Sequence, residues 1–215
     1  MILSAVTNSN GGMYLGLMSE FGDADDMGAQ SLLGINDGPF LTLLGLGLAG
    51  IASFDAKSLL ASVGTLIVGI VLGNIDSDIR DFLKPGIMFT LPFLAFALGT
   101  GLNLTNVVKG GGTGILLGVL TVVLTALFTI PSDRLILKRP GYAGAALCTT
   151  AGNAVATPAL VAAADASLAY QVEDATAAVA AAVIVTAILC PIVTSFVAKH
   201  WGCPKFDRQK QTTEV

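Results

Sequence analysis

Long apolar runs separated by short charged segments dominate the chain. Five runs contain no charged side chain: residues 58–75, 85–108, 110–132, 140–164 and 175–198. A sixth run, residues 27–54, contains one, Asp37. A helix needs about 20 apolar residues to cross the hydrocarbon core of a bilayer. The pattern therefore predicts six complete membrane-spanning helices, and because residues 1–18 are too short for a full span, we expect the chain to begin inside a helix.

The apolar runs are continuous rather than alternating. Strands of an outer-membrane barrel would show segments of about ten residues that alternate between apolar and polar positions. The sequence therefore predicts an all-helical membrane bundle. Pairs of glycines four residues apart also fit the spacing that lets two membrane helices approach closely, and these pairs are Gly34/Gly38, Gly69/Gly73 and Gly114/Gly118.

Composition agrees with a membrane protein and excludes other classes. The chain is 53% hydrophobic and 12% charged, whereas soluble domains carry about a quarter charged residues. A net charge of −4 gives no basic face for nucleic acid. The cysteines are odd in number and two lie in apolar runs, which argues against a disulfide framework. One histidine, His200, is too few for a histidine metal site or a Ser-His-Asp triad, so we expect no enzyme and no cofactor.

The lysines and arginines predict an orientation, because cytoplasmic loops carry an excess of them. Placing the C-terminus in the cytoplasm leaves only Lys57 and Lys109 outside. The residues then placed inside are Arg80, Lys84, Arg134, Lys138, Arg139, Lys199, Lys205, Arg208 and Lys210. The acidic loop at residues 20–26 also falls inside, although acidic residues contribute little to orientation.

Two apolar runs are interrupted by clusters of hydrogen-bonding residues, at residues 7–12 and 148–158. Asparagine, paired glycines and proline are poor helix formers, so we expect both helices to break there. In the predicted orientation the two segments run in opposite directions, which is typical of inverted-repeat transporters whose broken helices meet at the midplane. The substrate-binding candidates are Asn8, Ser9, Asn10, Gly11, Gly12, Thr149, Thr150, Gly152 and Asn153. The alternative is that these side chains only cap one another or their own backbone.

Asp37 is the one ionisable residue well inside a predicted span, next to Asn36. A buried carboxylate needs a proton, a cation or a partner, and the other spans contain no lysine or arginine. Asp37, with Asn36, is therefore the candidate for ion coupling, most simply by taking up a proton. Alternatively, the helix starts later and Asp37 caps it in wet surroundings. Thr100 and Asn103 are weaker candidates, because the end of a helix at the interface explains them equally well.

Several short motifs occur in a characteristic order along the chain. They are Asn10-Gly11-Gly12-Met13-Tyr14 with Leu17-Met18, then residues 93–99 running on to Asn103-Leu104, then Thr150-Ala151-Gly152 with Pro158. In this order, over about residues 1–196, they resemble the bacterial 2-keto-3-deoxygluconate permease family. The resemblance implies proton-coupled import of this sugar acid across the bacterial cytoplasmic membrane. It also implies kinship with the bile acid:sodium symporters, with two inverted five-helix repeats in which broken helices four and nine cross.

The resemblance also implies a division of the chain. Residues 1–54 would be the later part of broken helix four plus helix five, residues 55–201 the second repeat, and residues 202–215 a cytoplasmic tail. Three helices and the start of a fourth, about 80–100 residues at ~20 per span with loops, would then be missing. Thr100 and Asn153 depart from the family pattern, which has Asn and a small residue at those positions.

We therefore expect 2-keto-3-deoxygluconate:proton symport, with the lipid bilayer and a small sugar acid as partners and no nucleic acid. The substrate carboxylate would be held by the positive end of a half-helix in the second break, while Asp37 takes the proton. A sodium-coupled organic-anion transporter is the nearest alternative, since Thr and Asn oxygens also suit Na⁺. A passive pore or a non-functional fragment is the other. The sequence makes no prediction of oligomeric state.

Overall fold

The computed structural model describes residues 1–33, 56–83, 105–164 and 166–206, together with residues 41, 44, 48, 85, 86, 89, 90, 92, 93, 96 and 100. Within these residues the chain is all-helical and contains no strand, which confirms the predicted class. Asn36, Asp37 and Asn103 lie outside the described residues, as does the pair Gly34/Gly38.

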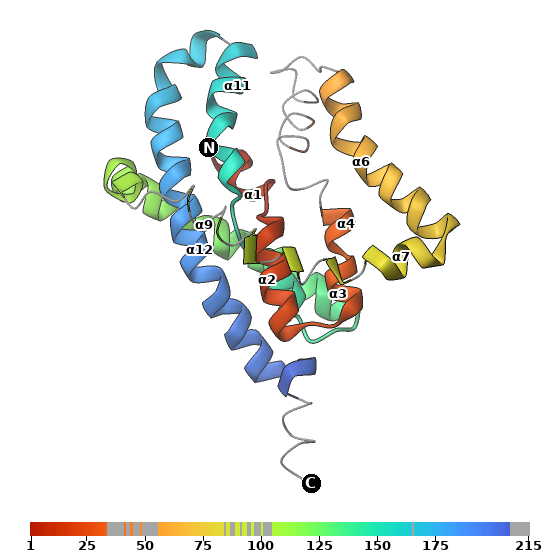
Figure 1. The fold of residues 1–215 in the computed structure, drawn as a ribbon. Coiled ribbons are helices and arrows are strands. Elements are labelled where there is room, and N and C mark those ends of the chain that lie inside the picture. The colour runs from red at the N-terminus through yellow and green to blue at the C-terminus, as the bar shows by residue number, and fades with distance from the viewer. Residues whose placement is uncertain are drawn as a thin grey trace.

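The helices follow the apolar runs and the two polar interruptions (Figure 1). In chain order they are α1 (Ile2–Val6), α2 (Gly11–Phe21), α3 (Ala24–Gly28), α4 (Gln30–Leu33), α6 (Ala56–Ile75), α7 (Ser77–Leu83), α9 (Thr105–Leu135), α10 (Tyr142–Ala145), the 3-10 helix η1 (Gly152–Ala156), α11 (Thr157–Ala164), the 3-10 helix η2 (Ala166–Gln171) and α12 (Val172–Trp201).

Three predicted spans are confirmed as helices. Residues 58–75 lie in α6, residues 110–132 in α9 and residues 175–198 in α12. Residues 140–164 are helical but broken, as expected, whereas most of 34–54 and 85–108 falls outside the described residues. In the described part of the chain, two helical stretches are long and apolar enough to cross a membrane, Val107–Leu135 and Ala166–Trp201.

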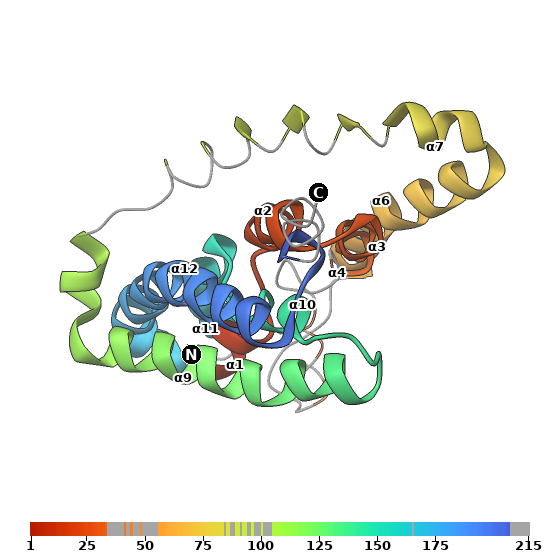
Figure 2. The same cartoon turned by 90° about the horizontal axis from the view of Figure 1, so that it is seen from below.

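Helices α9 and α12 pack along one another and form the frame of the molecule (Figure 2). Glycines bring the two backbones together. A Cβ added to Gly114 would lie 2.5 Å from Cβ of Ala181, and one added to Gly118 would lie 2.6 Å from Cβ of Val185. The predicted close approach at Gly114/Gly118 is therefore confirmed. At Gly69 and Gly73 the space is open, with no described atom within 4 Å of an added Cβ.

Helices α6 and α7 stand to one side of this frame (Figure 1). Their large apolar side chains are exposed along α6, among them Ile67, Val68 and Ile75, and continue to Phe82 on α7. Among the described residues, α6 makes its substantial helix contacts with α7. An apolar surface of this kind suits lipid or another membrane helix, because water would disfavour it.

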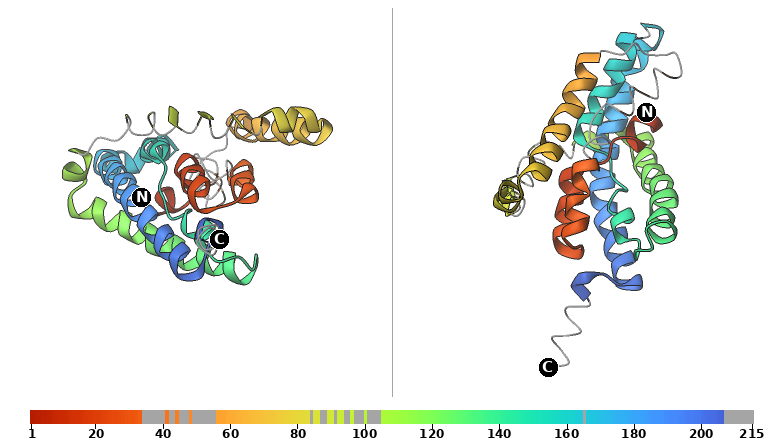
Figure 3. Two further views of the ribbon diagram at one scale, coloured as in Figure 1. Left: turned by 60° about the horizontal axis from the view of Figure 1, so that its bottom comes forward. Right: turned by 90° about the vertical axis from the view of Figure 1, so that its right-hand side faces the viewer.

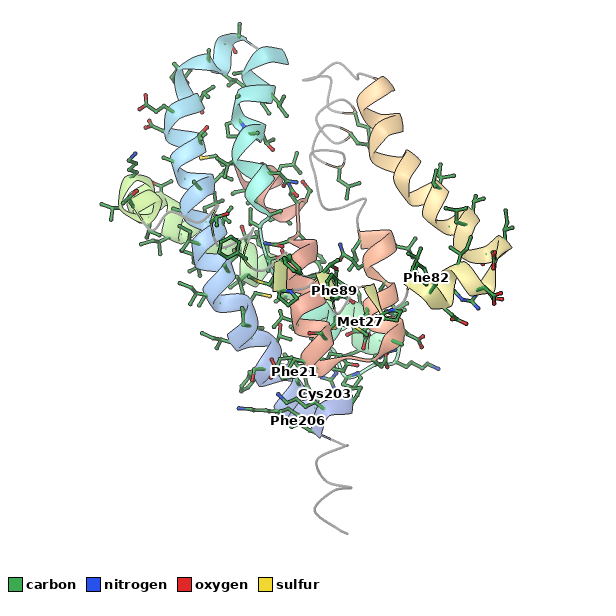
Figure 4. All side chains as sticks on the ribbon, viewed as in Figure 1. Phe21, Met27, Phe82, Phe89, Cys203 and Phe206 are labelled. Carbon is green, nitrogen blue, oxygen red and sulfur yellow. The ribbon has the colours of Figure 1, made fainter. Side chains whose placement is uncertain are left out.

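The far end of α12 folds back onto the end of α2. Gly202 turns the chain with a φ of 91°, after which Phe206 packs against Phe21 with ring centroids 6.3 Å apart. Figure 4 shows these rings beside the buried Cys203. Lys205 forms an ion pair with Glu20. The acidic loop therefore lies beside basic residues that the positive-inside pattern places on the same side.

We predict that Gly114→Ala separates α9 from α12, because the new methyl group meets a Cβ and backbone atoms that cannot rotate away. Overpacking of this kind costs about 1–3 kcal/mol. The control is Gly73→Ala, which meets no described atom within 4 Å and gains up to about 1 kcal/mol of helix propensity. Denaturant unfolding of the purified protein in micelles, followed by circular dichroism, measures both. Equal stability of the two variants would contradict the packing role of Gly114.

Candidate functional site

The first predicted break is confirmed. Helix α1 ends at Val6 and α2 begins at Gly11, so the residues between them leave the helix. Asn10 caps α2 in an extended conformation, with its side-chain oxygen accepting the Met13 N–H at 3.0 Å. Such a cap satisfies one of the backbone donors that every helix start exposes.

The second predicted break is confirmed as well. Helix α10 ends at Ala145, residues 148–151 are non-helical, and the chain re-enters a helix through η1 and α11. Pro158 is the second residue of α11, where its missing N–H and fixed φ cost little. The polar residues of the sequence therefore interrupt both helices where expected.

The two breaks lie against each other and exchange hydrogen bonds. Three bonds run from the second break to the first: the Ala151 N–H donates to the Asn8 carbonyl at 2.7 Å, the Thr150 hydroxyl to the Ala5 carbonyl at 3.0 Å, and the Thr149 hydroxyl accepts from the Asn10 N–H at 2.8 Å. We call this contact the crossing.

Two side chains of the first break complete the crossing. The Ser9 hydroxyl donates to the carbonyl of Leu147, and the Ser4 hydroxyl donates to the carbonyl of Ala154, each at 3.2 Å. Partner numbers rise along one break as they fall along the other, so the segments run in opposite directions. Figure 3 shows these segments in the interior of the bundle, beside α12.

Helices α9 and α12 support the second break from outside. On α12, the buried Thr186 hydroxyl accepts the Thr150 N–H at 3.1 Å. On α9, the Thr129 hydroxyl donates to the Gly144 carbonyl at 2.7 Å, and the Asp133 carboxylate accepts the Gly144 N–H at 3.1 Å. A Cβ on Gly144 would lie 2.4 Å from the Thr129 carbonyl oxygen, so only glycine fits this approach.

The structure brings most of the predicted site residues together and gives them different burial. Buried at the crossing are Asn8, Ser9, Asn10, Gly11, Thr149 and Thr150. Gly152 and Asn153 are exposed beside it, and Gly12 is partly exposed. Thr100 is exposed and forms no described part of the crossing. The binding roles of all these residues stay predictions.

A cavity of about 160 Å³ lies next to the crossing, between α1, α11 and the start of α12. Its lining is mostly apolar, and the polar contributions come from Ser4, Thr157 and Gln171. The Thr157 hydroxyl is buried and has no hydrogen-bond partner among the described residues. None of the nine predicted binding residues lines this cavity.

Sequence reasoning missed three of these hydroxyls. Ser4 lies in an apolar segment, Thr186 in the run 175–198, and Thr157 behind the more conspicuous Asn153. Each is an isolated polar residue in an apolar run. Because such a residue usually bonds to its own helix, the sequence offers no signal that Thr186 accepts from a distant backbone N–H.

We predict that Thr186→Val destabilises the protein, because it removes the acceptor of the buried Thr150 N–H. An unsatisfied buried donor costs about 1–3 kcal/mol. Thr176→Val, at a partly buried position on the same helix, is the matched control and should change stability much less. Denaturant unfolding in micelles compares the two. A Thr186→Val protein as stable as its control would show that the amide finds another acceptor.

Known proteins resemble this chain over nearly its full length. A family model described as 2-keto-3-deoxygluconate permease matches residues 1–203. A 2-keto-3-deoxygluconate permease 1 of Salmonella typhimurium is 52% identical over 198 residues, which is 92% of this chain and 62% of that protein. Permeases of Enterobacter sp. (strain 638) and Bacillus subtilis are 42% and 40% identical, over 99% and 92% of this chain and 65% and 60% of their own lengths.

The chain thus spans about three fifths of the length of these relatives. No solved structure matches it. The family match and the relatives' identities agree with the motifs that the sequence displays. The chain belongs to the 2-keto-3-deoxygluconate permease family, a family of membrane transporters rather than enzymes.

Proposed function

We propose that this chain carries 2-keto-3-deoxygluconate into the bacterial cell by proton symport. The observation that carries the proposal is the crossing of two broken helices, in a chain of a permease family. Non-helical backbone at membrane depth is tolerated where it is buried in protein or lines a polar cavity. Broken helices that meet in this way form the substrate and ion sites of inverted-repeat transporters.

The substrate, a sugar acid, offers one carboxylate, one carbonyl and several hydroxyls. Its carboxylate needs donors, and the start of η1 supplies the positive end of a half-helix together with the exposed amide of Asn153. The Thr149 hydroxyl accepts from Asn10, which leaves its own hydrogen to donate. The Thr150 hydroxyl has donated its hydrogen to Ala5 but can still accept one from a substrate hydroxyl.

Charge placement supports a cytoplasmic C-terminus and the inner membrane as location. Arg139 and Lys205, both on the predicted inner side, pair with acidic residues of the loop at residues 20–26. Lys109, on the predicted outer side, lies at the other end of α9. The antiparallel arrangement of the two breaks also favours the inverted-repeat fold of the bile acid:sodium symporter type.

Asp37 is the proposed proton carrier. Its apolar run would make the ionised carboxylate costly, so protonation before the transport step neutralises the site. Na⁺ is the alternative ion, since the crossing is rich in carbonyl and hydroxyl oxygens. The two ions make opposite predictions for which gradient drives uptake.

We predict that vesicles containing this chain accumulate labelled 2-keto-3-deoxygluconate above equilibrium when the inside is alkaline. A protonophore should abolish the accumulation. Asp37→Asn, which cannot take up the proton, should reduce it to the equilibrium level, whereas Asp25→Asn in the exposed loop should not. The full-length Salmonella typhimurium relative serves as the reference protein in the same vesicles.

Other outcomes separate the alternatives. Accumulation that follows an imposed Na⁺ gradient and ignores pH would replace proton coupling by sodium coupling. Equilibration without accumulation under either gradient would indicate a passive pore. Absence of any uptake, while the reference relative transports, would contradict the proposed function for this chain.

A further inference from the structure

A second polar cluster joins two loops far from each other in sequence. Arg139, between α9 and α10, places one Nη2 atom 2.7 Å from the Asp23 carboxylate and 2.9 Å from the Asp26 carboxylate. The carboxylates flank the start of α3 and cap it, since Asp23 accepts the Asp26 N–H and Asp26 accepts the Asp23 N–H. The loop at residues 20–26 is thereby fixed to the start of α10.

Asp26 connects this cluster to both half-helices of the crossing. Its carboxylate accepts a hydrogen bond of 2.7 Å from the Tyr142 hydroxyl at the start of α10. Its backbone carbonyl accepts one of 3.0 Å from the Tyr14 hydroxyl on α2. Both tyrosines and Asp26 are buried, at 1%, 3% and 5% exposure. One aspartate therefore links α2 to α10 through its two carbonyl-bearing groups.

The electrostatics show that the cluster is tightly bound rather than incidental. Burial raises the pKa of Asp26, although Tyr142 and Arg139 oppose the shift. Partial burial also acts to raise the pKa of Asp23, but hydrogen bonds from Asp26 and Arg139 hold it below its usual value. Breaking a buried pair leaves an uncompensated charge, which is strongly unfavourable.

The cluster and the crossing sit at opposite ends of the same two short segments. Tyr14 follows Asn10 by one helical turn, and its N–H donates to the Asn10 carbonyl. Tyr142 opens the four-residue helix α10, which leads directly into Thr149. A displacement of either tyrosine therefore moves a residue that bonds across the crossing.

We propose that Asp26 and Arg139 are positioning residues for transport, which hold α2 and α10 in the relative placement that the crossing requires. The inference rests on the proposed function, because the crossing is the proposed substrate site. It assigns the acidic loop a role beyond charge balance at the membrane surface. It also predicts that loosening the cluster changes substrate affinity, and not merely the amount of folded protein.

Native cysteines give a readout that is independent of transport. Cys148, next to Thr149, and Cys203, after α12, are both fully buried. Because the chain contains three cysteines, Cys190→Ala combined with Cys203→Ala or with Cys148→Ala leaves a single thiol to report on each place. Maleimide labelling of a buried thiol follows local opening.

We predict that Tyr142→Phe and Arg139→Gln each accelerate maleimide labelling of Cys148 by about tenfold, the size of effect that one lost hydrogen bond produces. Labelling of Cys203 should not change. The KM for 2-keto-3-deoxygluconate uptake should rise by a similar factor, and Arg139→Lys, which keeps the charge, should restore part of it. The matched controls are Lys138→Gln and Asp25→Asn, at exposed neighbouring positions.

Three results would overturn the inference. One is a Cys148 that stays protected in both variants. Another is equal acceleration at Cys148 and Cys203, which means global destabilisation. The third is a fall in maximal rate at unchanged KM, which means less folded protein. If the unsubstituted chain does not transport, the proposed function fails, whereas the labelling of Cys148 against Cys203 still decides whether the cluster holds α10.

Discussion

The constraint on which this structure depends is that interrupted helices must still satisfy their backbone hydrogen bonds. Each break frees N–H and C=O groups that lipid cannot satisfy. Here the second break supplies the partners of the first: the Ala151 N–H reaches the Asn8 carbonyl, and the Asn10 N–H reaches Thr149. Neither break is stable without the other, so the chain gains two polar interruptions only by placing them in contact.

The frame around the crossing follows from that contact. Backbone atoms must approach closely where short half-helices are held in place, and glycine permits the approach. Gly144 lets α10 lie against the Thr129 carbonyl, while Gly114 and Gly118 let α9 lie against α12. Thr186 on α12 then reaches the Thr150 N–H. The small residues and the buried hydroxyls therefore serve one arrangement, since the first set brings backbones near enough for the second to bond.

Local features were predictable from the sequence, and long-range pairing was not. The breaks could be predicted because Asn10, the paired glycines and Pro158 act on their own backbone. The acidic loop illustrates the limit. Its charges oppose a simple charge rule, yet the structure pairs Asp26 with Arg139 across 113 positions. No local pattern reports such a partner. The binding roles of the crossing residues, and the coupling role of Asp37, stay predictions for the same reason.

In the proposed carrier, the crossing also limits how the substrate is bound. Its polar groups already hold buried backbone, so a substrate that replaced those bonds would leave donors unsatisfied at a cost that its own contacts would have to offset. The substrate therefore gains most from capacity that the crossing leaves unused, such as the hydrogen of the Thr149 hydroxyl and the exposed amide of Asn153. Binding that adds to the crossing rather than replacing it can be reversed without dismantling the site, and a carrier must release its substrate in every cycle.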